Sequence, residues 1–435
     1  MAYGAGLMSK VPTSRSRQGS NSLQIRHYNE RVVLETIRRL GTASKAEIAR
    51  YANLTPQAVA TIIDALHDAG YLLQIGKRQG KIGQPSVLYA PNPARALSIG
   101  LHVGRRAMQA VVIDMAGQVM DQAAYEYDYP APDDIQDLSV KAVNKLEADL
   151  EPDLRQRLIG VGVSMPYFFN GWQEDLGFPS GLQKPWAKFN LPDFLNAQIR
   201  HDVFFENDAS AAAITELMLT KGEAQNNFIY FYIGTIIGGG LVMSANLETG
   251  LNGNAAAFNT FPVSPSTLSG APAPAGMFEI LQRRASVYVL LKYLRDKGID
   301  IKRVADLTSQ MQPFLEEWET DCAQALAQAA IGAVALVDIG TVIIDGILPP
   351  HSLARLVAKT EQFLSKNRPE GLVSPVLLQG RCGPRAPAIG AALLPFYANF
   401  TPNNDVLARK FKVESKPLLT GSFVGAARQM ESEVS

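Results

Sequence analysis

The residues best suited to chemistry are two segments near the middle of the chain. Asn207 and Asp208 stand between an apolar stretch and AAAITEL, where a strand is expected to end and a helix to begin. Residues 234–240 read GTIIGGG between two further apolar stretches. A carboxylate can accept a proton or a hydrogen bond from a hydroxyl, and glycines let the backbone approach a phosphate. The pattern could serve phosphoryl transfer or hydroxyl recognition, and Asp208 could instead be a helix N-cap.

Length and charge indicate several domains with different partners. A chain of 435 residues is long enough for two or three domains. Residues 1–95 hold 13 Lys or Arg and 5 Asp or Glu, giving +8, and the remainder holds 28 and 36, giving −8. A basic N-terminal region of this kind suits a polyanion, because Lys and Arg release counterions from phosphates. A merely solvated basic tail is the alternative.

Cysteine content and hydropathy argue against a secreted or membrane protein. Cys322 and Cys382 are far apart, so no disulfide framework or cysteine zinc site is expected. The first 28 residues lack the apolar core of a secretory signal and are expected to form a disordered basic arm. The apolar stretch 325–348 is interrupted by polar residues and glycines, which favours a buried helix and strand over a membrane span. A cytoplasmic location is expected.

Residues 29–93 predict a winged helix-turn-helix. A first helix is expected from Asn29 to Gly41. Ser44 and Glu47 match the capping box of a short second helix, and Thr55 with Pro56 starts a third helix that ends near Gly70. The text LLQIG, KRQGKIGQP, SVLYAPNP then predicts two strands around a basic loop.

The third helix has the pattern of a recognition helix, whose N-terminal residues read bases in the major groove. Its apolar stripe leaves small and amide side chains on the opposite face, and the basic loop could contact phosphates or enter the minor groove. An ordinary three-helix cap and a solvated hairpin are the alternatives. The expected DNA-binding residues are Thr55, Gln57, Ala58, Thr61, Lys77, Arg78, Lys81 and Gln84.

Residues 94–435 predict an α/β body. The segment 97–114 reads as strand, turn and strand, and residues 228–250 repeat this design with glycines at the bend. Two similar openings, each followed by helices, indicate two related lobes around a cleft for a small ligand.

From about residue 29 to 395, the chain resembles the ROK family of bacterial sugar kinases and sugar-responsive repressors. The resemblance rests on ENDASAAAITEL at 206–217, GTIIGGGLV at 234–242, GNA at 253–255 and IGAALL at 389–394. It implies a winged helix-turn-helix before a two-lobed, actin-like and hexokinase-like (ribonuclease H-like) body. Asn207 and Asp208 match the sugar-contacting pair of the family, in which the Asp is also the catalytic base. The expected ligand-binding residues are Asn207, Asp208, Asn254 and Ser164.

The chain departs from the kinase pattern at three places that would hold phosphate or nucleotide. His102 replaces an acidic residue of the first phosphate turn, although the following Arg105 and Arg106 could still attract a phosphate. Ile236 replaces a glycine of the second turn, and residues 342–348 hold one glycine where a Gly-rich nucleotide loop is usual. Catalysis is therefore not expected, and Asp208 is interpreted as a ligand-binding residue.

The carbohydrate side departs from the family as well. Ala257 and Thr260 stand where members have a sugar-binding Glu and a His that ligates zinc, and the three zinc cysteines are missing from the segment that follows. No metal and no cofactor are expected. Gln183, Lys184 and Trp186 could compensate, although Trp186 could equally be packing.

The sequence thus favours a regulator over an enzyme. We expect a transcriptional regulator, a repressor of carbohydrate uptake or catabolism genes, that binds operator DNA as a homodimer and a small carbohydrate effector in a degenerate cleft. An active ATP-dependent sugar kinase with a fused DNA-binding head and a regulator with a vestigial pocket are the alternatives.

Overall fold

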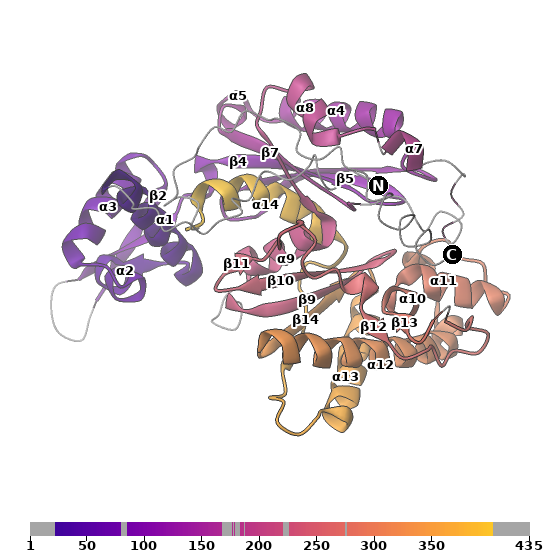
Figure 1. The fold of residues 1–435 in the computed structure, drawn as a ribbon. Helices are drawn as coiled ribbons and strands as arrows, with labels where there is room; N and C mark the ends of the chain where they lie inside the picture. Colours follow the sequence, from indigo (N-terminus) through magenta and orange to yellow (C-terminus); the bar gives the residue numbers. More distant parts are fainter. Residues whose placement is uncertain are drawn as a thin grey trace, which may run out of the picture.

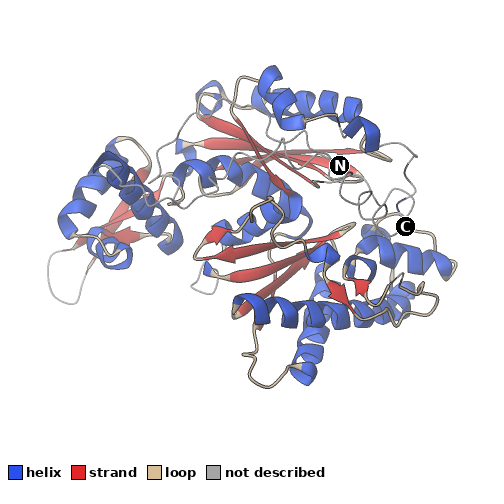
Figure 2. Cartoon of the chain, in the orientation of Figure 1, coloured by secondary structure: helices blue, strands red, loops and turns tan. Residues whose placement is uncertain are grey.

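A computed structural model describes residues 22–79, 85–167, 176, 178, 183–186, 188–220, 226–274 and 276–402. It shows a small N-terminal head beside a larger body of two lobes (Figure 1). Helices and strands alternate through the body, and each lobe has its own central sheet (Figure 2).

The head contains three helices and a three-stranded sheet of order β1-β3-β2. Its elements are α1 (Ser22–Leu40), β1 (Ala43–Ser44), α2 (Lys45–Ala52), α3 (Pro56–Asp68), β2 (Leu72–Arg78) and β3 (Ser86–Pro91). The predicted helix starts are confirmed, because Ser44 and Glu47 form the capping box of α2 and Thr55 caps α3. The first helix, however, begins at Ser22, seven residues before Asn29 and inside the segment expected to be a disordered arm.

Lobe one is built on a mixed sheet of order β6-β5-β4-β7-β8, with β4, β7 and β8 parallel. The strands are β4 (Leu97–Val103), β5 (Ala107–Asp114), β6 (Val119–Glu126), β7 (Leu158–Met165) and β8 (Val203–Asn207), and the helices are α4 (Pro132–Ala148), α5 (Pro152–Arg155), α7 (Gln183–Trp186) and α8 (Leu191–Gln198). The short 3-10 helix η1 (Pro93–Arg95) joins this lobe to the head.

Lobe two repeats the topology of lobe one, with sheet order β11-β10-β9-β14-β15 and β9, β14 and β15 parallel. The prediction of two related lobes is therefore confirmed. The strands are β9 (Phe228–Ile233), β10 (Ile237–Met243), β11 (Asn246–Leu247), β12 (Pro262–Val263), β13 (Glu279–Ile280), β14 (Thr341–Gly346) and β15 (Val376–Gln379). The helices are α10 (Gln282–Ala285), α11 (Val287–Asp296), α12 (Gln312–Val337) and α13 (Pro350–Asn367), with 3-10 turns η3 (Phe258–Thr260), η4 (Val304–Asp306), η5 (Ser309–Met311) and η6 (Gly383–Arg385).

Among the described residues, the helical stretch 309–337 is long and apolar enough to cross a membrane by length and composition. Within this fold, Trp318, Cys322 and Leu326 of the same stretch are fully buried in the core of lobe two. Residues 325–334 and β14 therefore form the buried helix and strand that the sequence predicts, whereas Leu336 near the end of α12 is 83% exposed.

Two helices, α9 (Asp208–Leu219) and α14 (Ala386–Phe400), lie between the two sheets (Figure 1). Alternate residues of β9 explain the layering, because Phe228, Tyr230 and Tyr232 face α9 while Ile229, Phe231 and Ile233 face the outer helices. In lobe one, Ser98 donates a hydrogen bond to the Ala392 carbonyl of α14. The helix pair thus forms the shared centre of the two lobes.

Small residues bring this helix pair and the sheets into close contact. A Cβ at Gly390 of α14 would lie 1.9 Å from the Ala211 carbonyl oxygen of α9. A Cβ at Gly162 of β7 would lie 1.7 Å from the Ala391 carbonyl oxygen of α14. Neither position has room for a side chain, so α14 is held against both α9 and the sheet of lobe one.

We expect Gly390→Ala to destabilise the protein by about 1–3 kcal/mol, because overpacking this contact outweighs the better helix propensity of alanine. The matched control is Gly340→Ala, since a Cβ there meets nothing within 4 Å. Thermal unfolding of the three proteins measures the difference. Equal melting temperatures for the two variants would contradict the close packing of α9 and α14.

Candidate functional site

The carboxyl ends of parallel strands in lobe one bring the predicted cleft residues together. Register places His102 of β4, Ser164 of β7 and Glu206 of β8 in one row. Asn207 is the last residue of β8, and Asp208 is the first of α9. Ligands of open α/β sheets bind beyond this edge, so the row marks the floor of a candidate cleft.

Asn207 and Asp208 shape the start of α9. The Asn207 side chain accepts hydrogen bonds from the Ala209 and Ser210 amides. Asn207 is therefore the N-cap of α9, a role that the sequence had suggested for Asp208. Asp208 Oδ1 accepts a hydrogen bond from the Ala209 amide at 2.9 Å. Both side chains are half-buried. A carboxylate has about four acceptor positions, so Asp208 keeps capacity for ligand hydroxyls.

Ser164 serves the packing of the cleft floor. It is fully buried, and its hydroxyl donates to the Pro387 carbonyl of α14 at 2.9 Å. His102 Nδ1 lies 3.2 Å from the hydroxyl oxygen of Ser164. Because the Ser164 proton points to Pro387, His102 donates through Nδ1–H. This structure therefore does not present Ser164 to a ligand, contrary to the sequence expectation; its hydroxyl joins β4, β7 and α14.

Asp208 interacts electrostatically with the side chains of His102 and Arg105. Burial lowers the pKa of His102, and the negative charge of Asp208 opposes that lowering. Burial also lowers the pKa of the Arg105 guanidinium, again opposed by Asp208. An imidazole with a lowered pKa is neutral at neutral pH, whereas arginine stays charged. The negative charge of Asp208 therefore acts on both His102 and Arg105.

Glu206 is a cleft residue that the sequence prediction missed. Its Oε1 accepts hydrogen bonds from the Tyr167 hydroxyl at 2.9 Å and from the Asn207 amide at 2.8 Å. Burial raises the pKa of Glu206. Its place beside Asn207 was visible in the sequence, but its partner Tyr167 is 39 residues away and follows a different strand.

The remaining predicted cleft residues are more dispersed. Asn254 is exposed in the loop after β11, outside the hydrogen bonds described for Asn207 and Asp208. Trp186 is packing, as the sequence allowed, because it is buried and its Nε1 donates to the Pro130 carbonyl at 2.7 Å. The side chains of Gln183 and Lys184 lie outside the described residues.

The glycine run of β10 packs against helix and aromatic side chains. A Cβ at Gly238 or Gly240 would lie 2.5 Å from the Cβ of Ala209 or Ala213 in α9, respectively. A Cβ at Gly239 would lie 2.2 Å from the Phe258 ring. The run is therefore needed to seat α9 on the sheet of lobe two, whether or not a phosphate binds.

The turn before this run is occupied by protein contacts. The Ile237 amide donates to Ser286 Oγ at 2.9 Å, while Gly234 and Thr235 carbonyls accept from the first amides of α11. Ile236 and Tyr288 pack against the hydrophobic cluster of lobe one. Apolar contacts between the lobes therefore fill the region in which a second phosphate turn was considered.

Two other segments considered for phosphate binding have structural roles. Arg106 is engaged elsewhere, because its guanidinium donates to the Asp128 and Leu176 carbonyls and lies over the Phe178 ring. Most of residues 342–348, where one glycine stands in place of a Gly-rich loop, form the buried strand β14, which ends at Gly346. Asp345 at its end accepts a hydrogen bond from Tyr230 at 2.9 Å, and burial raises its pKa.

A buried ion pair organises the segment that follows Thr260. Arg284 donates to Asp321 at 2.8 Å, and both side chains are almost completely buried. Asp321 also accepts from Ser266 and Thr267, which orders the loop after β12. Thr260 donates to the Ala257 carbonyl at 2.9 Å. Within the part of the chain that the structure describes, no group of three or more His, Cys, Asp or Glu is arranged to hold a metal.

The head presents the predicted recognition face. Thr55, Gln57 and Thr61 are exposed and Ala58 is half-buried, whereas Val59 and Ile63 lie in the core. The Thr55 hydroxyl accepts from the Ala58 amide at 3.3 Å. The N-terminal part of α3 therefore carries its polar residues on the outer surface, the arrangement required for reading base edges.

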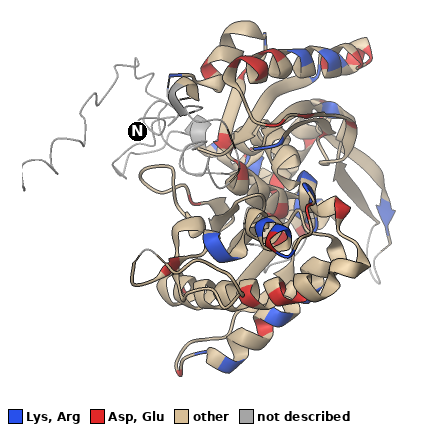
Figure 3. Ribbon diagram, turned by 90° about the vertical axis from the view of Figure 1, so that its right-hand side faces the viewer, with Lys and Arg blue, Asp and Glu red and all other residues tan. Residues whose placement is uncertain are grey.

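The wing places basic residues beside this face, with Lys77 and Arg78 exposed at the end of β2. Arg78 forms an ion pair with Glu47 of α2 at 2.7 Å, so a DNA phosphate would have to compete with Glu47 for it. Lys81 and Gln84 lie outside the described residues. Tyr51 near the end of α2 is 60% exposed, and the Arg50 guanidinium lies over its ring. On the view of the body in Figure 3, acidic and basic residues are interspersed along the helices.

Comparisons with known proteins agree with this architecture. The ROK family model matches residues 98–396. The chain is 27% identical to the uncharacterized protein y4fQ of Sinorhizobium fredii, covering 86% of this chain and 91% of that protein. It is 23% identical to a xylose repressor of Bacillus spizizenii, covering 65% and 72%, and 28% identical to a glucokinase of Halalkalibacterium halodurans, covering 43% and 56%.

Solved structures show the same fold. A ROK family transcriptional regulator, described as a homologue of the E. coli MLC protein, has a TM-score of 0.63 at 17% identity, covering 88% of this chain and 99% of that one. A ROK family glucokinase from Streptomyces griseus has a TM-score of 0.54 at 20% identity, covering 68% and 98%. The expected two-lobed, hexokinase-like fold with a helix-turn-helix head is thereby confirmed.

Two substitutions separate base reading from phosphate contact. We expect Lys77→Ala to weaken binding to all duplexes because it removes one phosphate contact. The slope of the logarithm of the binding constant against the logarithm of salt concentration should fall by about 1.

Gln57→Ala should instead lose about 1–3 kcal/mol of discrimination between operator and unrelated DNA. Fluorescence anisotropy at several salt concentrations measures both. Lys366→Ala on the exposed surface of α13 is the control, and unchanged discrimination by Gln57→Ala would show that α3 is not the reading helix.

Proposed function

Because this chain belongs to the ROK family, we propose that it is a DNA-binding transcriptional repressor whose cleft binds a carbohydrate effector. The observation that carries the proposal is the pair of helices α9 and α14, which run from the candidate cleft to the DNA-binding head. The effector changes operator affinity through this connection and undergoes no chemistry in the cleft.

The contents of the cleft support sensing over catalysis. Asp208 offers a carboxylate to hydroxyls, as a sugar site requires. Phosphoryl transfer requires metal ions and preorganised donors around the phosphates. Here the Ile237 amide is bonded to Ser286, Ile236 packs between the lobes, and His102 occupies the acidic position of the first turn.

Helix α9 connects the cleft to the head. Its first residue is Asp208, and its last residues, Met218 and Leu219, line a pocket shared with α1 of the head. Twelve residues of α-helix span about 18 Å, which sets the distance between these two ends. A ligand that displaces Asp208 therefore moves α9 and, through its last residues, the contact with the head.

Helix α14 makes a second connection in the same direction. Pro387 at its start accepts the Ser164 hydrogen bond on the cleft floor. At its end, Arg31 of α1 donates to the Ala398 and Thr401 carbonyls at 3.0 and 3.2 Å, and the Phe400 and Tyr71 rings lie 5.6 Å apart. Both helices thus reach the contact between head and body.

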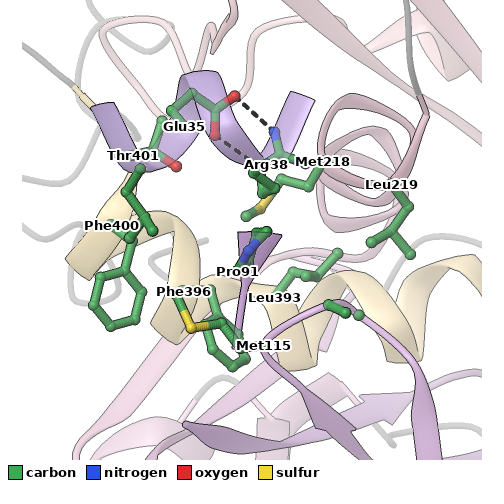
Figure 4. A pocket seen from close by; sticks show the side chains of 13 residues that line it. Glu35, Arg38, Pro91, Met115, Met218, Leu219, Leu393, Phe396, Phe400 and Thr401 are labelled. Atoms are coloured by element: carbon green, nitrogen blue, oxygen red, sulfur yellow. Dashed lines mark hydrogen bonds and ion pairs between the residues drawn. The ribbon is translucent and has the colours of Figure 1, made fainter. Parts of the chain in front are cut away.

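That contact is incompletely filled. Figure 4 shows the side chains of Met115, Met218, Leu219 and Phe396 around a pocket below the Glu35–Arg38 ion pair. A neighbouring cavity of about 280 Å³ extends along the same contact. Unfilled space leaves room for the head to shift relative to the body, and a ligand can shift it only by its differential affinity for the two positions.

We propose that the active form is a homodimer, because one small head buries little DNA and two heads read a two-fold-related site. The similarity to xylose repressors makes pentoses and hexoses the first effectors to test. Under this proposal the effector alters the placement of the two heads and so changes the affinity for the operator.

We expect Asp208→Asn to abolish the effector response and leave basal operator binding within about twofold. The amide replaces one acceptor by a donor and removes the charge-assisted hydrogen bond to a sugar hydroxyl, a loss of about 1.5–3 kcal/mol. Thermal-shift screening against sugars, sugar acids and sugar phosphates identifies the effector, since a ligand specific for the folded state raises stability by about 2.7 kcal/mol at 100 times its Kd. Operator affinity with and without that effector then measures the response.

The outcomes separate the alternatives. No stabilisation by any carbohydrate would indicate a vestigial pocket and would contradict sensing. The retained Asp208 and the similarity to a glucokinase favour an active kinase as the second candidate. Turnover of ATP with a sugar that exceeds the turnover of Asp208→Ala would establish that kinase and overturn our proposal.

A further inference from the structure

A second concave space lies at the contact between head and body, at the opposite end of α9 from the cleft floor. Its walls come from α1 and the end of β3 in the head, the β5–β6 turn of lobe one, the last turn of α9 and the second half of α14. The pocket in Figure 4 and the neighbouring cavity of about 280 Å³ are parts of one space, because both are lined by Arg38, Pro91, Met115, Ala116, Met218 and Leu219. Ligand sites are frequent at such boundaries between domains.

The walls of this space are mostly apolar and adaptable. The pocket is surrounded by side chains that include Met115, Met218, Phe396 and Phe400 (Figure 4). Methionine is flexible and polarisable, so it adapts to ligands of different outline. An apolar cavity of about 150 Å³ is large enough to hold benzene. The neighbouring cavity of about 280 Å³ therefore has room for an aromatic ring or an aliphatic chain that carries one polar group.

One side of the space carries an excess of positive charge. Among the described residues that line it, those with a charge are Glu35, Arg38 and Arg39 of α1. Arg38 donates to the Glu35 carboxylate at 2.6 and 2.8 Å, and Arg39 donates to it at 2.7 Å. Burial alone would raise the pKa of Glu35, but the two arginines lower it, so the carboxylate is ionised. Two guanidinium groups thus share one carboxylate, and one positive charge is left unbalanced among the three.

The arginines are suited to a further acceptor. A guanidinium group carries five N–H donors. Glu35 takes two of these from Arg38 and one from Arg39, and the Asn226 side chain accepts another from Arg39. Carboxylates match guanidinium groups with paired hydrogen bonds. An apolar molecule with one carboxylate therefore complements both the walls and the charge, whereas a sugar would bury its hydroxyls against apolar side chains.

We propose that this space is a second ligand site, separate from the cleft, for a small carboxylate with an aromatic or aliphatic body whose charged end binds Arg38 and Arg39. A bound molecule contacts α1 and the ends of α9 and α14 together, so it fixes the head relative to the body. Its effect on operator affinity rests on the proposed repressor function, whereas its binding does not.

Isothermal titration calorimetry of the full chain tests the site. Benzoate and octanoate have both the charge and an apolar body, acetate has the charge alone, and benzamide has the ring without the charge. We expect benzoate or octanoate to bind about tenfold more tightly than acetate and benzamide, because charge-assisted hydrogen bonds and apolar burial then act together. The same probe should change operator affinity, measured by fluorescence anisotropy, in Asp208→Asn as well as in the unchanged protein.

Substitutions separate the two parts of the site. Arg39→Met removes the unbalanced charge and leaves the Glu35–Arg38 pair, so the advantage over benzamide should be lost, and Arg39→Lys should retain part of it. Met115→Trp fills the space and should weaken the binding of benzoate and octanoate. Arg26→Met, which removes an exposed arginine of the same helix, is the matched control and should bind like the unchanged protein. Melting curves establish that each variant is folded, and Arg39→Lys keeps the test valid if another variant is not.

Four results would overturn this inference and leave the sensing function intact. Benzoate and octanoate could be silent while a sugar shifts operator affinity, or benzamide could bind as tightly as benzoate. Loss of probe binding in Asp208→Asn would place the probe in the cleft. Binding that is seen only after removal of residues 403–435 would show that the chain's own C-terminal segment takes the space. Silence of these probes and of all sugars would contradict the sensing function too.

Discussion

The close packing of α9 against α14 between the two sheets is the constraint on which the rest of the structure depends. Gly390 brings the two helix backbones together, and Gly162 brings α14 onto the sheet of lobe one. The glycine run of β10 does the same for α9 and lobe two. Because both helices start at the cleft floor and end at the head, the packing that stabilises the fold also joins the two functional regions.

This constraint changes the interpretation of the glycine run. In the sequence, GTIIGGG suggests a phosphate turn, but each glycine of its last three has a packing reason in the structure. Protein groups also engage the turn before the run, because Ser286 Oγ accepts a hydrogen bond from the Ile237 amide and Ile236 packs against the hydrophobic cluster of lobe one. The packing requirements of this fold therefore account for the glycine run without a bound phosphate.

Local signals made the head and the repeated lobes predictable from sequence. Ser44 with Glu47 and Thr55 with Pro56 act within one helical turn, so their pattern identifies the helix starts directly. The role of Ser164 was not predictable, because it depends on register between β4 and β7 and on the approach of Pro387 from 223 residues away. The position of β14 between β9 and β15 was not predictable for a similar reason, since it depends on long-range pairing.

We propose that binding in the cleft is transmitted to the head through α9 and α14. Hydrogen exchange of the full chain, with and without an effector identified by thermal shift, is the decisive measurement. We expect changed protection at the start of α9 and also in α1 and the last turn of α14, where Arg31 donates to the Ala398 and Thr401 carbonyls. Changes confined to the cleft, with α1 and the end of α14 unaffected, would contradict it.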